Sequence, residues 1–266
     1  MKKLPIFAVA LAAMAFTACG GNKSGQTVEE TDSLKSFEQD QIEQKIKVEF
    51  DSLASELGKL KKLPIVSTEG GIQLTAEEKQ VKPDYLLNPS VAENAETLAE
   101  KYRMLSALNV DKSVAAAYEM PVDEYKAAIT KLVTALNDPS FKEMDDSGTL
   151  MEEAQSLYNA MDANGRINFF WQMAATSLVE QLYIISQNTD KFLESFDDDA
   201  AANVTFRIVL LQDAINRLTA YDTEIAPVTE AIKPLSALNA VSVSELKGQI
   251  ETAKEQIVAA RTALVK

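Results

Sequence analysis

Glu180 is the residue of this chain whose position most strongly suggests chemistry, because it lies on an apolar face of a predicted helix. Met173 and Ile184 stand on either side of it on that face. A carboxylate buried among such residues is unfavourable unless it is protonated or paired. Arg207 is the first candidate partner, since it lies beside the apolar positions of the next predicted helix.

Two interpretations of this position stay open. In the first, Glu180 and its partner form a structural ion pair or hydrogen-bond network, as buried charged pairs often do. In the second, they line a polar pocket that anchors a small molecule, with Gln181, Tyr183 and Gln187 as further members. A buried Glu180 is expected in both cases.

The composition excludes several other kinds of site. The chain has no histidine and one cysteine, so zinc and haem have no ordinary ligands and triads that use His or Cys are ruled out. A hydrolase with a paired Asp and Glu is a third interpretation, although no spacing singles out such a pair. Asp197, Asp198 and Asp199 are predicted to cap a helix, because a calcium loop needs ligands that the following alanines do not supply. We expect no cofactor, no metal and no enzymatic activity.

Cys19, the single cysteine, follows a typical secretion signal. Lys2 and Lys3 are basic, residues 4–16 are apolar but too short to span a bilayer, and small residues precede the cysteine. Phe16-Thr17-Ala18-Cys19 resembles the lipobox of bacterial lipoproteins. The resemblance implies that residues 1–18 are a signal peptide that is cleaved off, and that Cys19 is acylated and anchors the protein in a membrane.

The location follows from the residues after the cysteine. Gly20 stands where an aspartate would retain a bacterial lipoprotein at the inner membrane, and the acidic signal of some surface lipoproteins is missing nearby. We therefore expect an outer-membrane lipoprotein that faces the periplasm rather than the cell surface. The net charge of −14 disfavours nucleic acid as a partner, and a protein partner in the envelope is expected instead.

The rest of the chain predicts helices. Residues 19–33 are polar and glycine-containing, which is typical of a flexible tether. Residues 34–266 are expected to form one all-α domain, an antiparallel bundle of about eight helices with no substantial sheet and a long irregular connection at 64–90. The predicted helices are 34–63, 88–105, a short one within 111–119, 121–136, 150–161, 167–196, 197–218, a short segment between Pro227 and Pro234, and 242–266.

The helix 167–196 is expected at the centre of the fold, since it is apolar on two faces. Its segment Trp171–Gln187 resembles the central helix of a family of all-helical Bacteroidetes lipoproteins of unknown function. Members have paired small residues, here Ala174-Ala175, then a Glu, a Leu/Tyr-Ile group and a Gln. Lys82-Pro83-Asp84-Tyr85-Leu86-Leu87 is similar to the segment that enters their bundle. The resemblance implies a helical fold and an envelope location, and it carries no active-site residues.

These features favour a membrane-tethered, non-enzymatic helical module that binds a protein partner or organises the envelope. The alternative is a helical bundle that binds a small molecule in a polar pocket near Glu180. An exposed apolar patch would favour the first function, and a concave polar cavity the second.

Overall fold

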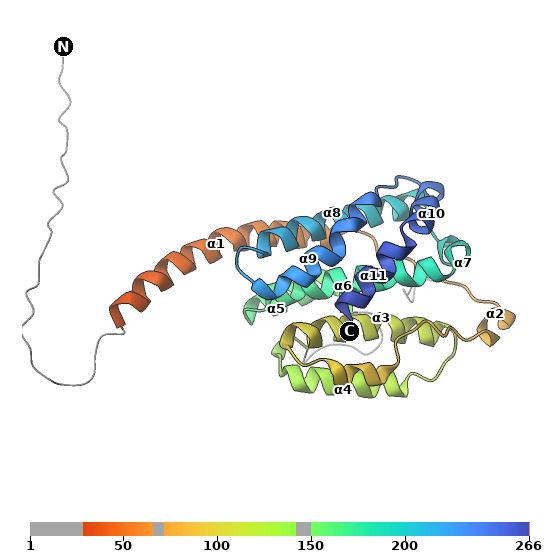
Figure 1. Ribbon diagram of the computed structural model, residues 1–266, viewed down its shortest axis with the longest axis horizontal. Coiled ribbons are helices and arrows are strands. Elements are labelled where there is room, and N and C mark those ends of the chain that lie inside the picture. The colour runs from red at the N-terminus through yellow and green to blue at the C-terminus, as the bar shows by residue number, and fades with distance from the viewer. Residues whose placement is uncertain (1–28, 66–71, 142–149, 266) are drawn as a thin grey trace, which may run out of the picture. The chain divides into compact units, whose positions relative to one another are not determined.

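The computed structural model describes residues 29–65, 72–141 and 150–265 of the chain (Figure 1). The predicted signal peptide, Cys19 and the predicted tether as far as residue 28 lie outside these ranges. The chain divides into two units, residues 1–46 and 47–266. Helix α1 (Glu29–Lys59) begins in the first unit, five residues before the helix predicted from Leu34, so part of the predicted tether is helical. The second unit holds the end of α1 and all other described elements.

Within the described ranges every regular element is a helix and no strand occurs, which confirms the predicted all-α class. The α-helices after α1 are α2 (Ala76–Gln80), α3 (Leu98–Ala117), α4 (Asp123–Leu136), α5 (Ala154–Ala163), α6 (Ile167–Gln187), α7 (Thr189–Leu193), α8 (Asp198–Leu218), α9 (Ala226–Ile232), α10 (Val243–Thr252) and α11 (Lys254–Leu264). Short 3-10 helices are η1 (Pro89–Asn94), η2 (Pro139–Phe141), η3 (Leu150–Glu153), η4 (Thr223–Ile225) and η5 (Lys233–Ala237).

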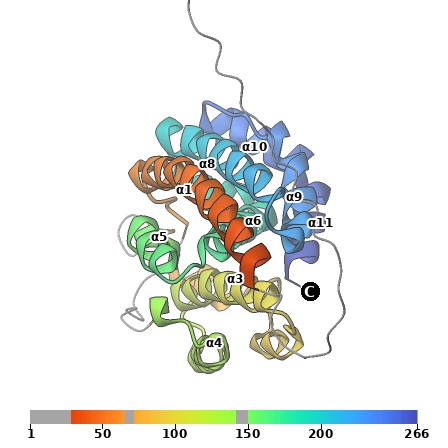
Figure 2. The same ribbon diagram turned by 90° about the vertical axis from the view of Figure 1, so that its left-hand side faces the viewer.

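Helix α6 is the centre of the second unit, as its two apolar faces predict. It packs against α3, α5, α8, α9 and α11, and the end-on view shows these helices around it (Figure 2). Trp171 and Leu182 of α6 are fully buried. The ring of Trp171 lies 5.9 Å from that of Phe50 on α1, which brings the end of α1 into the same core. A helix enclosed in this way must also satisfy its polar side chains from within the protein.

Capping contacts define several of the helix boundaries. Asp197 accepts a hydrogen bond from the backbone N–H of Ala200 and begins α8, as the acidic cluster predicts. Ser242 accepts one from Glu245 N and begins α10. Asn137 takes a left-handed conformation with φ of 47° and ends α4. These local contacts satisfy backbone groups that a helix end leaves unpaired.

Several predicted helix boundaries differ from the structure. The helix predicted over 88–105 is a 3-10 turn and then α3, because Thr97 and Glu100 form a capping box that starts a new helix. The residues predicted as a short helix within 111–119 belong to the same α3, which runs without interruption to Ala117. The predicted helix 167–196 ends at Gln187, since Asn188 caps α7 with its side chain.

The last predicted helix is also divided, at Ala253, into α10 and α11. In the irregular connection 64–90, the described residues form only α2 and the start of η1. The sequence also allows a small hairpin between Val66 and Ile72-Gln73-Leu74 in this connection, but Val66 lies outside the described residues. No helix in the described part of the chain is both long and apolar enough to cross a membrane.

Candidate functional site

Glu180 lies in the middle of α6 and is buried, with 1% of its side chain exposed, as predicted. Its partner is Arg261 of α11. Arg261 Nε donates to both carboxylate oxygens at 2.9 Å, and Nη2 lies 2.8 Å from Oε1. The prediction of Arg207 as the partner is therefore wrong. Arg207 belongs to α8, on another side of α6, and its Nη2 donates to the carbonyl oxygen of Lys61 at 2.7 Å.

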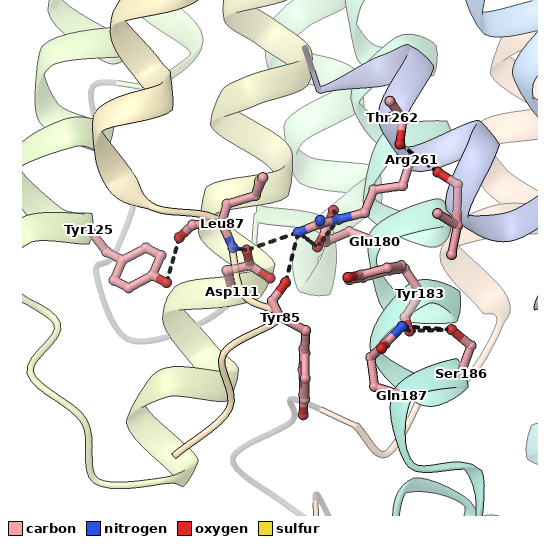
Figure 3. Close-up of polar contacts among 11 residues, drawn as sticks. Tyr85, Leu87, Asp111, Tyr125, Glu180, Tyr183, Ser186, Gln187, Arg261 and Thr262 are labelled. Carbon is pink, nitrogen blue, oxygen red and sulfur yellow. Dashed lines mark hydrogen bonds and ion pairs between the residues drawn. The ribbon is translucent and has the colours of Figure 1, made fainter.

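A second carboxyl group, that of Asp111 on α3, completes the cluster (Figure 3). Its side chain is fully buried, and Oδ2 lies 3.8 Å from Arg261 Nη2. The same oxygen accepts a hydrogen bond of 2.7 Å from the backbone N–H of Leu87. Oδ1 is buried and has no hydrogen-bond partner among the described residues. One guanidinium thus faces two carboxyl groups that come from two different helices.

Burial controls the ionisation of these groups. It raises the pKa of Asp111 well above its ordinary value, and the neighbouring Glu180 raises it further. Burial also raises the pKa of Glu180, against the opposing effect of Arg261. For Arg261, burial alone would lower the pKa, but the hydrogen bonds to Glu180 turn the net shift upward. These directions favour a protonated Asp111 beside an ionised Glu180 that is paired with Arg261.

The cluster also fixes the chain segment that enters the bundle before η1. Arg261 Nη2 donates to the carbonyl oxygen of Tyr85 at 3.3 Å. Two residues later, the carbonyl oxygen of Leu87 accepts a hydrogen bond of 2.8 Å from the Tyr125 hydroxyl of α4. The guanidinium of Arg261 lies 3.9 Å from the centre of the Tyr183 ring, a cation–π contact. Arg261 therefore joins α6, α11 and the segment at 85–87, and lies within ion-pair distance of α3.

The other predicted members do not gather at one place. Tyr183 contributes its ring to the cluster, as Figure 3 shows. Gln187 donates only to the Tyr183 carbonyl and the Ser186 hydroxyl at the end of α6. Gln181 donates to Ser177 Oγ at 3.1 Å, on the side of α6 that faces α8. Since successive residues of a helix point in directions about 100° apart, Glu180 and Gln181 belong to different environments.

Arg207 has a separate environment on that other side. Its guanidinium contacts the carbonyl oxygens of Leu60 and Lys61 just beyond the end of α1. Its Nε is fully buried and has no hydrogen-bond partner among the described residues. Burial lowers the pKa of Arg207 to about 10. The sequence correctly marks Arg207 as close to the core, but within the described part of the chain its guanidinium donates to carbonyl oxygens and forms no ion pair with a carboxylate.

Arg261 and Asp111 were missed in the sequence, although both carry the signal that identifies Glu180. Arg261 follows Ala260 on the apolar side of the last predicted helix, and Asp111 comes three residues after Leu108. Asp111 begins the short helix predicted within 111–119, and this prediction hides its place on the long buried helix α3. All three charged residues stand beside apolar helical positions in the sequence.

The arrangement at Glu180 can hold elements together, because both oxygens of the carboxylate are already bound by the chain's own arginine. Among the described residues no group of His, Cys, Asp and Glu is placed to hold a metal ion. No protein-family model, no curated protein and no solved structure matches the chain. The resemblance to the helical Bacteroidetes lipoproteins therefore stays a prediction.

Proposed function

We propose that this protein is a lipid-anchored helical module of the outer membrane that works by binding a protein partner and catalyses no reaction. The anchor would be Cys19, on the evidence of the basic, apolar and small residues that precede it. The module would face the periplasm, because Gly20 follows the cysteine and no acidic export signal comes next.

The observation that carries the partner-binding part is a pair of apolar side chains on the outer face of α8. Phe206 and Val209 are 59% and 58% exposed. They stand three residues apart, so they lie next to each other on successive turns. The opposite face of α8 is already used for the core through Val204, Ile208 and Leu211. Apolar residues on both faces of one helix are typical of a helix that packs on two sides, and exposed aromatic residues are frequent in protein interfaces.

Site-specific crosslinking in the intact envelope tests this proposal. A photoreactive amino acid at position 206 or 209 should form a crosslinked product with a distinct protein. The matched control is position 258 on α11, where Val258 is 38% exposed in a different part of the surface. If positions 206 and 209 give the same products as position 258, the partner-binding surface on α8 is refuted.

The anchor is tested separately by fractionation. Replacement of Cys19 with Ser removes the acylation site, so the protein should leave the outer-membrane fraction. Each acyl methylene buried in the bilayer contributes about 0.8 kcal/mol, and several acyl chains are needed for stable attachment. Unchanged outer-membrane fractionation of the Cys19→Ser protein would contradict a lipid anchor.

The alternative function, a small-molecule site near Glu180, meets a specific obstacle. Arg261 binds both oxygens of the carboxylate, so a ligand would have to displace the chain's own guanidinium. If Glu180 is structural, Glu180→Gln should destabilise the fold. If instead Glu180→Gln leaves stability unchanged and abolishes capture of a small molecule from envelope extracts, the ligand function is the correct one.

A further inference from the structure

A pocket of about 290 Å³ lies between the end of α1 and the start of α5, with Arg207 of α8 in its wall. We propose that this pocket binds a small monocarboxylate with a short apolar chain. The volume is at the lower end of the range of ligand pockets, so the ligand must be small. The proposal concerns a different region from the Glu180 cluster, and it does not depend on membrane anchoring or on the partner surface.

Arg207 supplies the charge that would hold the carboxylate. Its Nη2 donates to carbonyl oxygens, and its buried Nε has no partner among the described residues. The lowering of its pKa to about 10 has burial as its cause. A guanidinium prefers a planar, two-oxygen partner, and a carboxylate fits this preference.

The pocket extends inward from Arg207. A second cavity of about 20 Å³ shares Leu57, Met151 and Arg207 with the first and reaches Ser177 and Gln181 on α6. This volume is enough for about one water molecule. Arg207 thus borders both the outer pocket and the small cavity behind it.

The remaining lining specifies the kind of anion. Leu57, Leu60 and Met151 offer an apolar surface for a short alkyl chain, whereas Ser156 offers a hydroxyl. Glu153 also lines the pocket and adds a negative charge, and Lys62 adds a positive charge. Because Glu153 and the net charge of −14 repel anions, a monoanion is favoured over phosphate or a dicarboxylate.

The close approach of α1 and α5 forms one wall of the pocket. A Cβ atom on Gly58 would lie 3.2 Å from Cβ of Gln155, closer than such atoms normally come. Glycine at this position therefore lets the two helices come together beside Arg207.

Calorimetric titration of the purified full-length chain with hexanoate tests the proposal. We expect saturable binding with a dissociation constant on the order of 1 mM, as the small size of the ligand implies. Hexanamide has the same shape without the charge, so it should bind about tenfold more weakly or not at all. Equal binding of hexanoate and hexanamide would overturn the proposal.

Two substitutions with opposite expected effects on affinity separate a change at the binding site from a general loss of folding. Arg207→Gln should weaken hexanoate binding about tenfold or more, whereas the control Arg217→Gln on the same helix should leave it unchanged. Glu153→Gln removes the repelling charge and should tighten binding by roughly twofold to fourfold. Glu153 makes no side-chain cap to α5, so this variant should fold normally. Unchanged affinity in both Arg207→Gln and Glu153→Gln would contradict the site.

The alternative occupant of the Arg207 pocket is an acidic side chain of the protein itself. Residues 142–149 lie outside the described part and contain Glu143, Asp145 and Asp146, shortly before Met151 in the sequence. A variant with these three neutralised should bind hexanoate as the wild type does. Binding that occurs only in this variant would show that Arg207 serves an internal carboxylate and would overturn the proposal.

Discussion

Two arginines are largely buried on different sides of helix α6, and they differ in what they contact. Arg261 meets the ionised Glu180 and the neighbouring Asp111, and its pKa is raised. Among the described residues Arg207 donates to carbonyl oxygens and forms no ion pair, and its pKa is lowered to about 10. Burial of a charged side chain alone therefore does not identify a functional site. A buried charge with a complete set of partners favours a structural role, and one without a counter-ion favours a role in binding.

The largest expected effect is the loss of Arg261. Arg261→Met leaves the buried carboxylate of Glu180 without its counter-ion, which should cost about 3–5 kcal/mol of the free energy of unfolding. Urea denaturation measures the change. The control is Arg217→Met, which breaks pairs with Asp213 and Glu49 that are exposed and should cost about 0–1 kcal/mol. Similar losses in the two variants would refute the structural role of Arg261.

Leu182→Ala tests the burial of α6, the helix between the two arginines. Leu182 is fully buried, so its truncation should cost about 2–5 kcal/mol. The matched control is Val209→Ala on the exposed face of α8, where a change within about 0.5 kcal/mol is expected for a surface position. A loss below about 0.5 kcal/mol for Leu182→Ala would mean that α6 is not the centre of the fold.

Arg207→Met should have a much smaller effect than Arg261→Met. It removes a hydrogen bond to the backbone just beyond α1, worth about 0.5–1.5 kcal/mol, and no carboxylate is left unpaired by its loss. The same urea experiment supplies the measurement. A loss as large as that of Arg261→Met would show that Arg207 has a carboxylate partner in the folded chain, and the contrast between the two arginines would disappear.

The pH dependence of stability tests whether Asp111 is protonated in the folded protein. Its folded-state pKa is raised, so the folded state binds this proton more tightly than the unfolded state does. The resulting stability is complete below the unfolded pKa of about 3.9 and is lost as pH rises toward the raised pKa of the folded state. Asp111→Asn imitates the protonated form, so its stability relative to the wild type should increase as pH rises through this window. A constant difference across the window would contradict the protonated Asp111.

Some of this could be predicted from the sequence because it depends on local pattern. The all-α class and the centrality of α6 follow from apolar periodicity, and the cap at Asp197 follows from residue type. Glu180 was correctly predicted to be buried because Met173 and Ile184 define its face. These predictions need no knowledge of which helices are neighbours in space.

The partners could not be predicted in the same way. Arg207 was chosen for Glu180 because its helix comes next in the chain, whereas α11, which comes last, lies against the Glu180 side of α6. The breaks at Asn188 and Ala253 were missed because the apolar pattern continues across them. Gln181 was grouped with its neighbour Glu180, but adjacent residues on an enclosed helix face different helices. The Arg207 pocket depends on the approach of α1 to α5, which no local pattern reports.

The most direct test of the account is a double-mutant cycle of Glu180→Met and Arg261→Met, measured by urea denaturation. Each single variant leaves one charge buried without its partner, and each should cost about 3–5 kcal/mol. The double variant removes both charges, so it should be more stable than either single variant. If the two losses simply add within about 0.5 kcal/mol, Glu180 and Arg261 do not act as a pair, and the account of the cluster is wrong.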